Sequence, residues 1–340
     1  MAYTTISKSS DYFNTKLYTG NSSTQNITGL DFQPDWVAIK DRDATNSFMT
    51  FDAVRGATEL LNWNTTNAQS TQTPTLTSFN SDGFSIGNNT ALNTNGNDLV
   101  AWNWKANGVG SANTDGSITA TLSANSTSGF SISTFTTPGS GTFTVGHGLG
   151  VAPKMIIYRP TGSSSWQVGH NSIGWTNFLT LNSTSASSAS TAFGNTAPTT
   201  SYWTGNTANV GANAPCVAYC FADVQGYSKF GKFTGNGSTD GTFVYTGFKP
   251  AFVIIKNISD SSNEWNMFDN KRDSFNVITK RLVANGNSAD APSTYIDFLS
   301  NGIKCRTSNN LANGSGLSYI YMAFAEAPLV GTNNVPCTAK

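Results

Sequence analysis

The sequence predicts an all-β protein made of three tandem antiparallel β-sandwich or jelly-roll repeats with a short N-terminal arm. Short runs of β-branched and aromatic residues alternate with Gly and Asn turns, and helical periodicity is scarce, so no long crossover helices are available for a parallel sheet. In addition, one stretch that consists of a turn, a proline and an apolar strand occurs three times along the 340 residues.

The recurring stretch marks the start of a central strand in each repeat. Proline fixes φ and lacks an N–H donor, so it suits the first residue of a strand. The β-branched and aromatic run behind it suits a pleated, half-buried surface. The three copies cover residues 29–40, 148–159 and 247–256.

Each copy is followed, at a similar distance, by an apolar strand that contains an alanine. The distance from proline to alanine is 67 residues for Pro34 and Ala101, 65 for Pro153 and Ala218, and 73 for Pro250 and Ala323. Spacings this close indicate three copies of one unit.

The repeats set the predicted domain boundaries. We expect an arm at 1–17, a first repeat at 18–108, a diverged second repeat at 109–225, a third repeat at 226–330 and a tail at 331–340. The second repeat is the diverged copy because it lacks a clear counterpart of the Asp-Gly or Asn-Gly strand turn found in the other two.

Composition excludes several function classes. Charged residues make up only 11% of the chain, against about 25% in an average soluble protein. The formal net charge is zero and no basic block is present, so we expect no nucleic-acid binding. No stretch approaches the ~20 apolar residues of a membrane span, so no membrane insertion is expected. The first residues also lack the pattern of a secretory signal.

The four cysteines do not indicate a disulfide framework. Cys216 and Cys220 fall on one predicted strand, where four residues span about 13 Å, so they cannot bond each other. We favour buried free thiols over metal ligands for this pair, while Cys305 and Cys337 are isolated. Neither His147 nor His170 has a ligand-like partner at short spacing. No metal or cofactor is therefore expected.

A calcium site is a weaker alternative at residues 41–43. Asp41 and Asp43 are two alternating carboxylates in a predicted loop. Calcium takes six to eight oxygen ligands, so two carboxylates alone are insufficient to predict a site.

Two charge pairs recur at matching positions. Asp52 and Arg55 follow the first proline as Asp269 and Arg272 follow the third, while the second repeat has His170 there. They could orient a ligand in a cleft or act as structural pairs. We favour structural pairs, because recurrence at one position indicates a role in the fold.

Enzyme chemistry has little support. A glycosidase needs two carboxylates at a set separation, yet the chain has only three glutamates and most aspartates lie in turns. No Gly-x-Ser-x-Gly elbow joins a strand to a helix. The sequence therefore predicts that the protein is not an enzyme.

Seven of the eight tryptophans fall into two groups. Trp36, Trp102 and Trp104 lie on apolar strands and are predicted to be core residues. The other group lies closer to polar segments and is predicted to be exposed, where it would contact a glycan or a partner: Trp63, Trp166, Trp175 and Trp203.

Motifs along nearly the whole chain carry a family resemblance. They are residues 11–20, 32–35, 55–56, 81–84, 100–105, 145–157 and 325–330. These motifs resemble a repeat domain of proteins from tailed bacteriophages, marine ones especially. The resemblance implies a virion structural protein with domains similar to the concanavalin-like jelly-roll class, and it supplies no catalytic residues.

We therefore expect a phage virion structural protein on the particle exterior, in a tail fibre or appendage or as a head decoration. Its expected partners are other copies of itself, with a trimer as the state usual for fibres, and other virion proteins. The alternative is a carbohydrate-binding adhesion module for host surface glycans. A polysaccharide-degrading enzyme is a distant third hypothesis.

Overall fold

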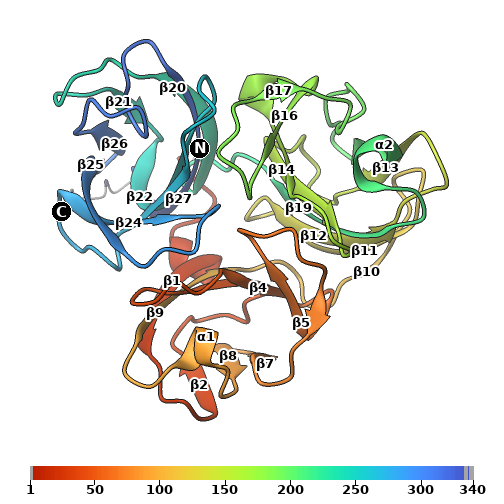
Figure 1. Cartoon of the computed structure of the whole chain (residues 1–340). Coiled ribbons are helices and arrows are strands. Elements are labelled where there is room, and N and C mark those ends of the chain that lie inside the picture. Colours follow the sequence, from red (N-terminus) through yellow and green to blue (C-terminus); the bar gives the residue numbers. More distant parts are fainter. Residues whose placement is uncertain (1–2, 333–335, 337–340) are drawn as a thin grey trace.

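The computed structural model describes residues 3–332 and residue 336, and it shows three β-rich lobes around a common centre (Figure 1). The pairs that build the main sheets are antiparallel. The predicted all-β, antiparallel fold class is thus confirmed. We call residues 13–104 the first lobe, 111–221 the second lobe and 228–328 the third lobe.

The first lobe follows a short 3-10 helix, η1 (Ser9–Asp11). It pairs a six-stranded sheet of order β1-β9-β3-β4-β5-β6 with a three-stranded sheet of order β2-β8-β7. Its elements are β1 (Phe13–Thr19), β2 (Gln25–Thr28), β3 (Trp36–Asp41), β4 (Met49–Asp52), β5 (Gly56–Asn62), β6 (Ser70–Thr71), β7 (Leu76–Asn80), β8 (Gly83–Ile86), α1 (Thr90–Asn93) and β9 (Asp98–Trp104).

The second lobe has an eight-stranded sheet of order β10-β11-β12-β19-β14-β15-β16-β17 and a two-stranded sheet of β13 and β18. Its elements are β10 (Ser111–Asn113), β11 (Ala120–Asn125), β12 (Phe130–Thr136), β13 (Thr142–Gly146), β14 (Met155–Pro160), β15 (Gln167–His170), η2 (Asn171–Ile173), β16 (Asn177–Thr180), β17 (Ser188–Ala189), β18 (Tyr202–Asn206), α2 (Thr207–Val210) and β19 (Pro215–Phe221).

The third lobe is one eight-stranded sheet of order β20-β27-β22-β23-β24-β25-β26-β21. Its elements are β20 (Ser228–Thr234), β21 (Phe243–Tyr245), β22 (Phe248–Asn257), β23 (Trp265–Asp269), β24 (Ile278–Val283), β25 (Ala291–Leu299), β26 (Gly302–Cys305) and β27 (Ser318–Pro328).

One order of five strands recurs in the three lobes. It is β1-β9-β3-β4-β5 in the first, β12-β19-β14-β15-β16 in the second and β20-β27-β22-β23-β24 in the third. The proline-led strand occupies the middle of this order each time, as β3, β14 or β22. The shared order supports the interpretation of the lobes as copies of one unit.

The register corrects one predicted equivalence. Ala101 pairs with Ile39 and Ala218 with Tyr158, but the matching partner of Ile255 is Tyr321 and not Ala323. Tyr321 is larger than the alanine of the other two lobes, and it fits because its neighbour on β20 is Gly231. A Cβ on Gly231 would lie 2.5 Å from the Tyr321 hydroxyl.

The proline-led strands are buried on both faces. In β3, Val37 and Ile39 belong to the sandwich core of the first lobe, whereas Trp36 and Ala38 belong to a cluster shared by all three lobes. This explains the unbroken apolar run, which is typical of strands covered on both sides. The shared cluster, called the central cluster below, includes Trp36, Trp102, Trp104, Phe130, Tyr219, Phe221, Phe252 and Phe324.

Aromatic rings join the lobes within the central cluster. The rings of Trp36 and Tyr219 stack with centroids 4.3 Å apart, and those of Trp104 and Phe324 meet edge to face at 5.9 Å. Trp36, Trp102 and Trp104 are all buried, so the prediction that they are core residues is confirmed.

The predicted arm is shorter than expected. Strand β1 begins at Phe13 and therefore crosses the boundary placed after residue 17. Phe13 is part of the central cluster, where its ring stacks on Phe324 at 4.9 Å. None of the described strands crosses the boundaries after residues 108 and 225.

Three cysteines, Cys216, Cys220 and Cys305, are free and buried. Burial raises the pKa of Cys216 and of Cys305 to about 12, so both stay as thiols at neutral pH. The prediction of buried free thiols at Cys216 and Cys220 is confirmed, and Cys337 lies outside the described residues. None of the helices in the described part of the chain has the length and apolar character needed to cross a membrane.

Candidate functional site

The two predicted charge pairs are formed and buried. Arg55 Nε lies 2.5 Å from Asp52 Oδ2, and Arg272 Nε lies 2.6 Å from Asp269 Oδ2. Each aspartate also accepts the main-chain N–H of its arginine through Oδ1, at 2.8 and 2.9 Å. The side chain therefore closes the turn after β4 or β23, in agreement with the prediction of structural pairs.

Each aspartate also binds a residue of another lobe. The Tyr219 hydroxyl of the second lobe donates to Asp52 Oδ2 at 2.8 Å. The Trp102 indole N–H of the first lobe donates to Asp269 Oδ2 at 3.3 Å. Burial alone would lower the pKa of Arg55, but Asp52 and Tyr219 raise it above its ordinary value. These pairs thus fix one lobe against the next.

His170 is the second-lobe counterpart of the two aspartates. It pairs with Met155, as Asp52 pairs with Trp36 and Asp269 with Phe252. The imidazole is fully buried, and Nδ1 accepts the N–H of Ser172 at 3.1 Å. Burial lowers its pKa to about 4, so it is neutral at pH 7.

Three buried basic residues mark the far ends of the proline-led strands. Lys40, Arg159 and Lys256 face Val100, Val217 and Ile320 in matching registers. Burial lowers the pKa of both lysines to about 8 and that of Arg159 to about 10.

Two of these cations bind main-chain carbonyls of the preceding lobe. Arg159 donates to the carbonyl oxygens of Asn67 at 2.8 Å and of Thr65 and Thr66 at 3.4 Å. Lys256 donates to the Thr184 carbonyl at 2.8 Å. Carbonyl groups carry no net charge. The two cations therefore hold loops of the preceding lobe by hydrogen bonds alone, and no carboxylate is buried beside them in these contacts.

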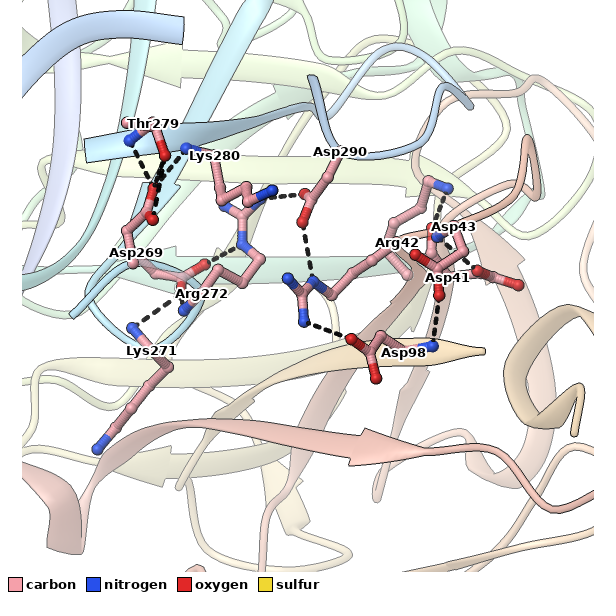
Figure 2. Close-up of polar contacts among 12 residues, drawn as sticks. Asp41, Arg42, Asp43, Asp98, Asp269, Lys271, Arg272, Thr279, Lys280 and Asp290 are labelled. Atoms are coloured by element: carbon pink, nitrogen blue, oxygen red, sulfur yellow. Dashed lines mark hydrogen bonds and ion pairs between the residues drawn. The ribbon is translucent and has the colours of Figure 1, made fainter. Parts of the chain in front are cut away.

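The junction between the third and first lobes has a different chemistry (Figure 2). Asp290 accepts Arg42 Nε at 2.8 Å through one carboxylate oxygen and Arg272 Nη1 at 2.7 Å through the other. Arg42 also lies 3.6 Å from Asp98. Among the residues that the structure describes, Arg42 and Asp290 form the only ion pair between two lobes.

The carboxylates at residues 41–43 are occupied by protein donors. Asp41 Oδ1 accepts the N–H groups of Asp43 and Ala44, and Oδ2 accepts the amides of Asn46 and Asn97 at 3.0 and 2.9 Å. Within the described residues, no group of three or more His, Cys, Asp or Glu side chains is placed to hold a metal ion.

The prediction of exposed tryptophans is wrong. The exposed fractions are 2% for Trp63, 0% for Trp166, 7% for Trp175 and 0% for Trp203. Trp63 and Trp166 belong to the central cluster, and the other two fill the core of the second lobe. Polar neighbours indicated exposure, but those segments lie where one lobe packs on another or over its own sheet.

Among the described residues, the exposed large apolar side chains lie elsewhere, and three of the five are in the third lobe: Val109, Val151, Phe243, Tyr245 and Phe275. Tyr245 lines a groove of about 500 Å³. A second groove, of about 470 Å³, lies beside Arg55 between the first and second lobes.

Sequence reasoning missed the buried cations and Asp290. A signal for the cations was present, since every copy of the recurring stretch has a basic residue six positions after its proline: Lys40, Arg159 and Lys256. Asp290 has no comparable signal, because its partner Arg42 is 248 residues away.

The fold and its junctions define a three-lobed all-β protein whose buried charges lie between lobes. The model of the family described as Domain of unknown function (DUF7483) matches residues 8–328, and the chain belongs to this family. No curated protein and no solved structure matches the chain.

Proposed function

We propose that this chain is a structural protein on the exterior of a tailed-phage virion, in a tail fibre or appendage or as a head decoration. It acts by assembly and surface contact and not by catalysis. The observation that carries the proposal is the use of the buried charged groups. Asp52, Asp269, Arg159 and Lys256 bind groups of a neighbouring lobe, so they build a rigid body in place of a reactive cleft.

The surface fits the same role. With charged residues at 11% of the chain, hydroxyl and amide groups dominate the exterior. Such a surface packs against copies of itself and other virion proteins through hydrogen bonds, with little charge to desolvate. The sequence motifs that resemble phage repeat domains support the location.

Particle labelling tests this proposal. Antibodies raised against the purified chain are expected to label intact particles of the phage that encodes it, at the tail or on the head, in negative-stain electron microscopy. Purified particles that lack the chain by mass spectrometry would contradict the proposal. Mass photometry of the free protein then tests the expected self-association.

A second candidate function is adhesion to a host surface glycan. The tryptophans on which the sequence based this alternative are buried, so the candidate needs another surface. The groove beside Tyr245 provides one, because an aromatic side chain that is 54% exposed lies next to charged and hydroxyl groups. Adsorption of the purified chain to host cells, and its loss after removal of cell-surface polysaccharide, tests this function.

A further inference from the structure

The edge of the third lobe presents two aromatic side chains to solvent. Strand β21 holds Phe243 and Tyr245, which are 44% and 54% exposed, on either side of buried Val244. Alternate residues of a strand point to one face, so both rings lie on the outer face of β21.

The first lobe shows that the fold does not require these aromatics. Tyr245 pairs with Gly302 and Phe243 with Lys304, as Thr28 pairs with Gly83 and Asn26 with Ser85 on β2. The matching residues, Asn26 and Thr28, are polar and exposed, while Ile27 is buried like Val244. The inner residue is thus needed for packing, whereas the outer aromatics are particular to the third lobe.

A groove with a polar wall lies beside Tyr245. Its volume is about 500 Å³, within the ~300–1,000 Å³ of small-molecule sites. It is lined by Tyr3, Asp223, Gln225, Lys229, Thr246 and Gly247. The groove therefore combines an exposed ring with donors and acceptors.

The charged groups of the wall form a neutral, well-oriented pair. Lys229 Nζ lies 2.6 Å from Asp223 Oδ2, and the side chains keep 43% and 26% exposure. Asp223 Oδ1 accepts the N–H of Phe230 at 2.9 Å, which fixes the carboxylate against β20. The pair offers both a donor and an acceptor while it leaves no net charge to attract an ionic ligand.

We propose that this groove binds an uncharged saccharide, with Tyr245 as the stacking platform and the Asp223 and Lys229 pair as the polar contact. The C–H face of a sugar ring carries partial positive charge and packs on the negative face of an aromatic ring. Sugar hydroxyls both donate and accept, so they match a paired carboxylate and ammonium group. This site rests on the second candidate function, adhesion to glycans, and does not depend on the place of the chain in a virion.

A glycan array tests the proposal with the full chain. The probes are uncharged hexose and N-acetylhexosamine oligosaccharides of two to four units, and hits are quantified by titration calorimetry. Tyr245→Ala is expected to weaken binding by about tenfold through loss of stacking, while Tyr245→Phe keeps the ring and stays close to wild type. Lys229→Gln is expected to weaken binding because it removes the ammonium group of the polar wall. Phe275→Ala removes an aromatic that is 76% exposed and does not line this groove, so it serves as the matched control and leaves affinity unchanged.

The outcomes separate the site from the function. Array binding by the wild type that persists in both Tyr245→Ala and Lys229→Gln overturns the groove and leaves adhesion standing. No binding by the wild type to any oligosaccharide overturns both. Thermal unfolding of each variant identifies misfolding, and if Tyr245→Ala misfolds, Lys229→Gln alone decides between these outcomes.

Discussion

Asp290→Asn should weaken the junction between the third and first lobes. The Asp290 side chain is 9% exposed and receives one hydrogen bond from each of two arginines, Arg42 at 2.8 Å and Arg272 at 2.7 Å. Removal of one partner of a buried ion pair costs about 3–5 kcal/mol when it leaves a charge without compensation. Here each arginine keeps a second carboxylate, Asp269 at 2.6 Å for Arg272 and Asp98 at 3.6 Å for Arg42. We therefore expect a lower cost, about 2 kcal/mol of unfolding free energy.

Urea denaturation is the suitable assay, because guanidinium salt would screen the ion pair itself. The matched control is Asp240→Asn, which removes an aspartate that is 86% exposed and lies 2.7 Å from Lys304. Exposed pairs contribute little to stability, so this control should show no resolvable change. If Asp290→Asn is as stable as Asp240→Asn, the ion pair does not stabilise the junction and the reasoning is refuted.

Three further predictions follow from the junctions. Arg159→Met leaves the carbonyls of residues 65–67 without their donor, so the free energy of unfolding in urea should fall by about 3 kcal/mol. Arg159→Lys should retain part of that stability, because lysine is the residue at this position in the other two lobes. The lowered pKa of His170 means that the unfolded chain binds a proton more readily than the folded chain. The contribution of neutral His170 to the free energy of unfolding should therefore be fully present above pH 6.5 and fall by up to about 3 kcal/mol as the pH drops toward 4. His170→Asn should flatten that slope in urea titrations at several pH values, and an unchanged slope would exclude His170 as its source. Because the lobes share the central cluster, scanning calorimetry should show one cooperative transition, and three separate transitions would contradict a shared core.

The sequence was sufficient to predict those features of the fold that depend on residues close together in the chain. The proline-led strands and the Asp52 and Asp269 turns depend on residues within a few positions of one another, so composition and spacing were sufficient to find them. Burial of Trp63 and Trp166 depends on contacts between lobes. The Trp166 indole N–H donates to the Asn62 carbonyl, 104 residues away, at 2.8 Å. A prediction that treats each repeat as a separate sandwich cannot see such a contact and leaves the tryptophan exposed.

The groove beside Tyr245 illustrates the same limit. Alternation along β21 could be found in the sequence, yet Asp223 and Lys229 come from the segment that leads into the third lobe and from β20. Tyr3 joins them because the start of the chain lies against this lobe, where the Tyr3 hydroxyl donates to the Gly247 carbonyl at 2.7 Å. A site assembled from three separate segments leaves no spacing to recognise.

The ion pair between lobes lies at the junction of the third and first lobes, and the way the three junctions are connected explains this position. The first and second lobes, and the second and third, are joined by short peptides, which keep their surfaces at high effective concentration. An indole completes each of these junctions, since Trp166 donates to Asn62 and Trp265 donates to the Thr180 carbonyl at 3.0 Å.

Within the described residues, the third junction has no short peptide link and no indole that donates to a main-chain carbonyl; its indole, Trp102, donates to the Asp269 carboxylate instead. No short peptide leads from β27 to β1. Phe48 also stands where the other lobes have tryptophan: Phe48, Trp166 and Trp265 each donate their main-chain N–H to an asparagine side chain. Without a tether or an indole bound to a main-chain carbonyl, orientation has to come from directional contacts between side chains, of which Trp102 with Asp269 is one. A carboxylate between two guanidinium groups meets that need, because opposite charges set register as well as attraction. The ion pair of Arg42 and Asp290 therefore lies at the junction where the covalent chain contributes least.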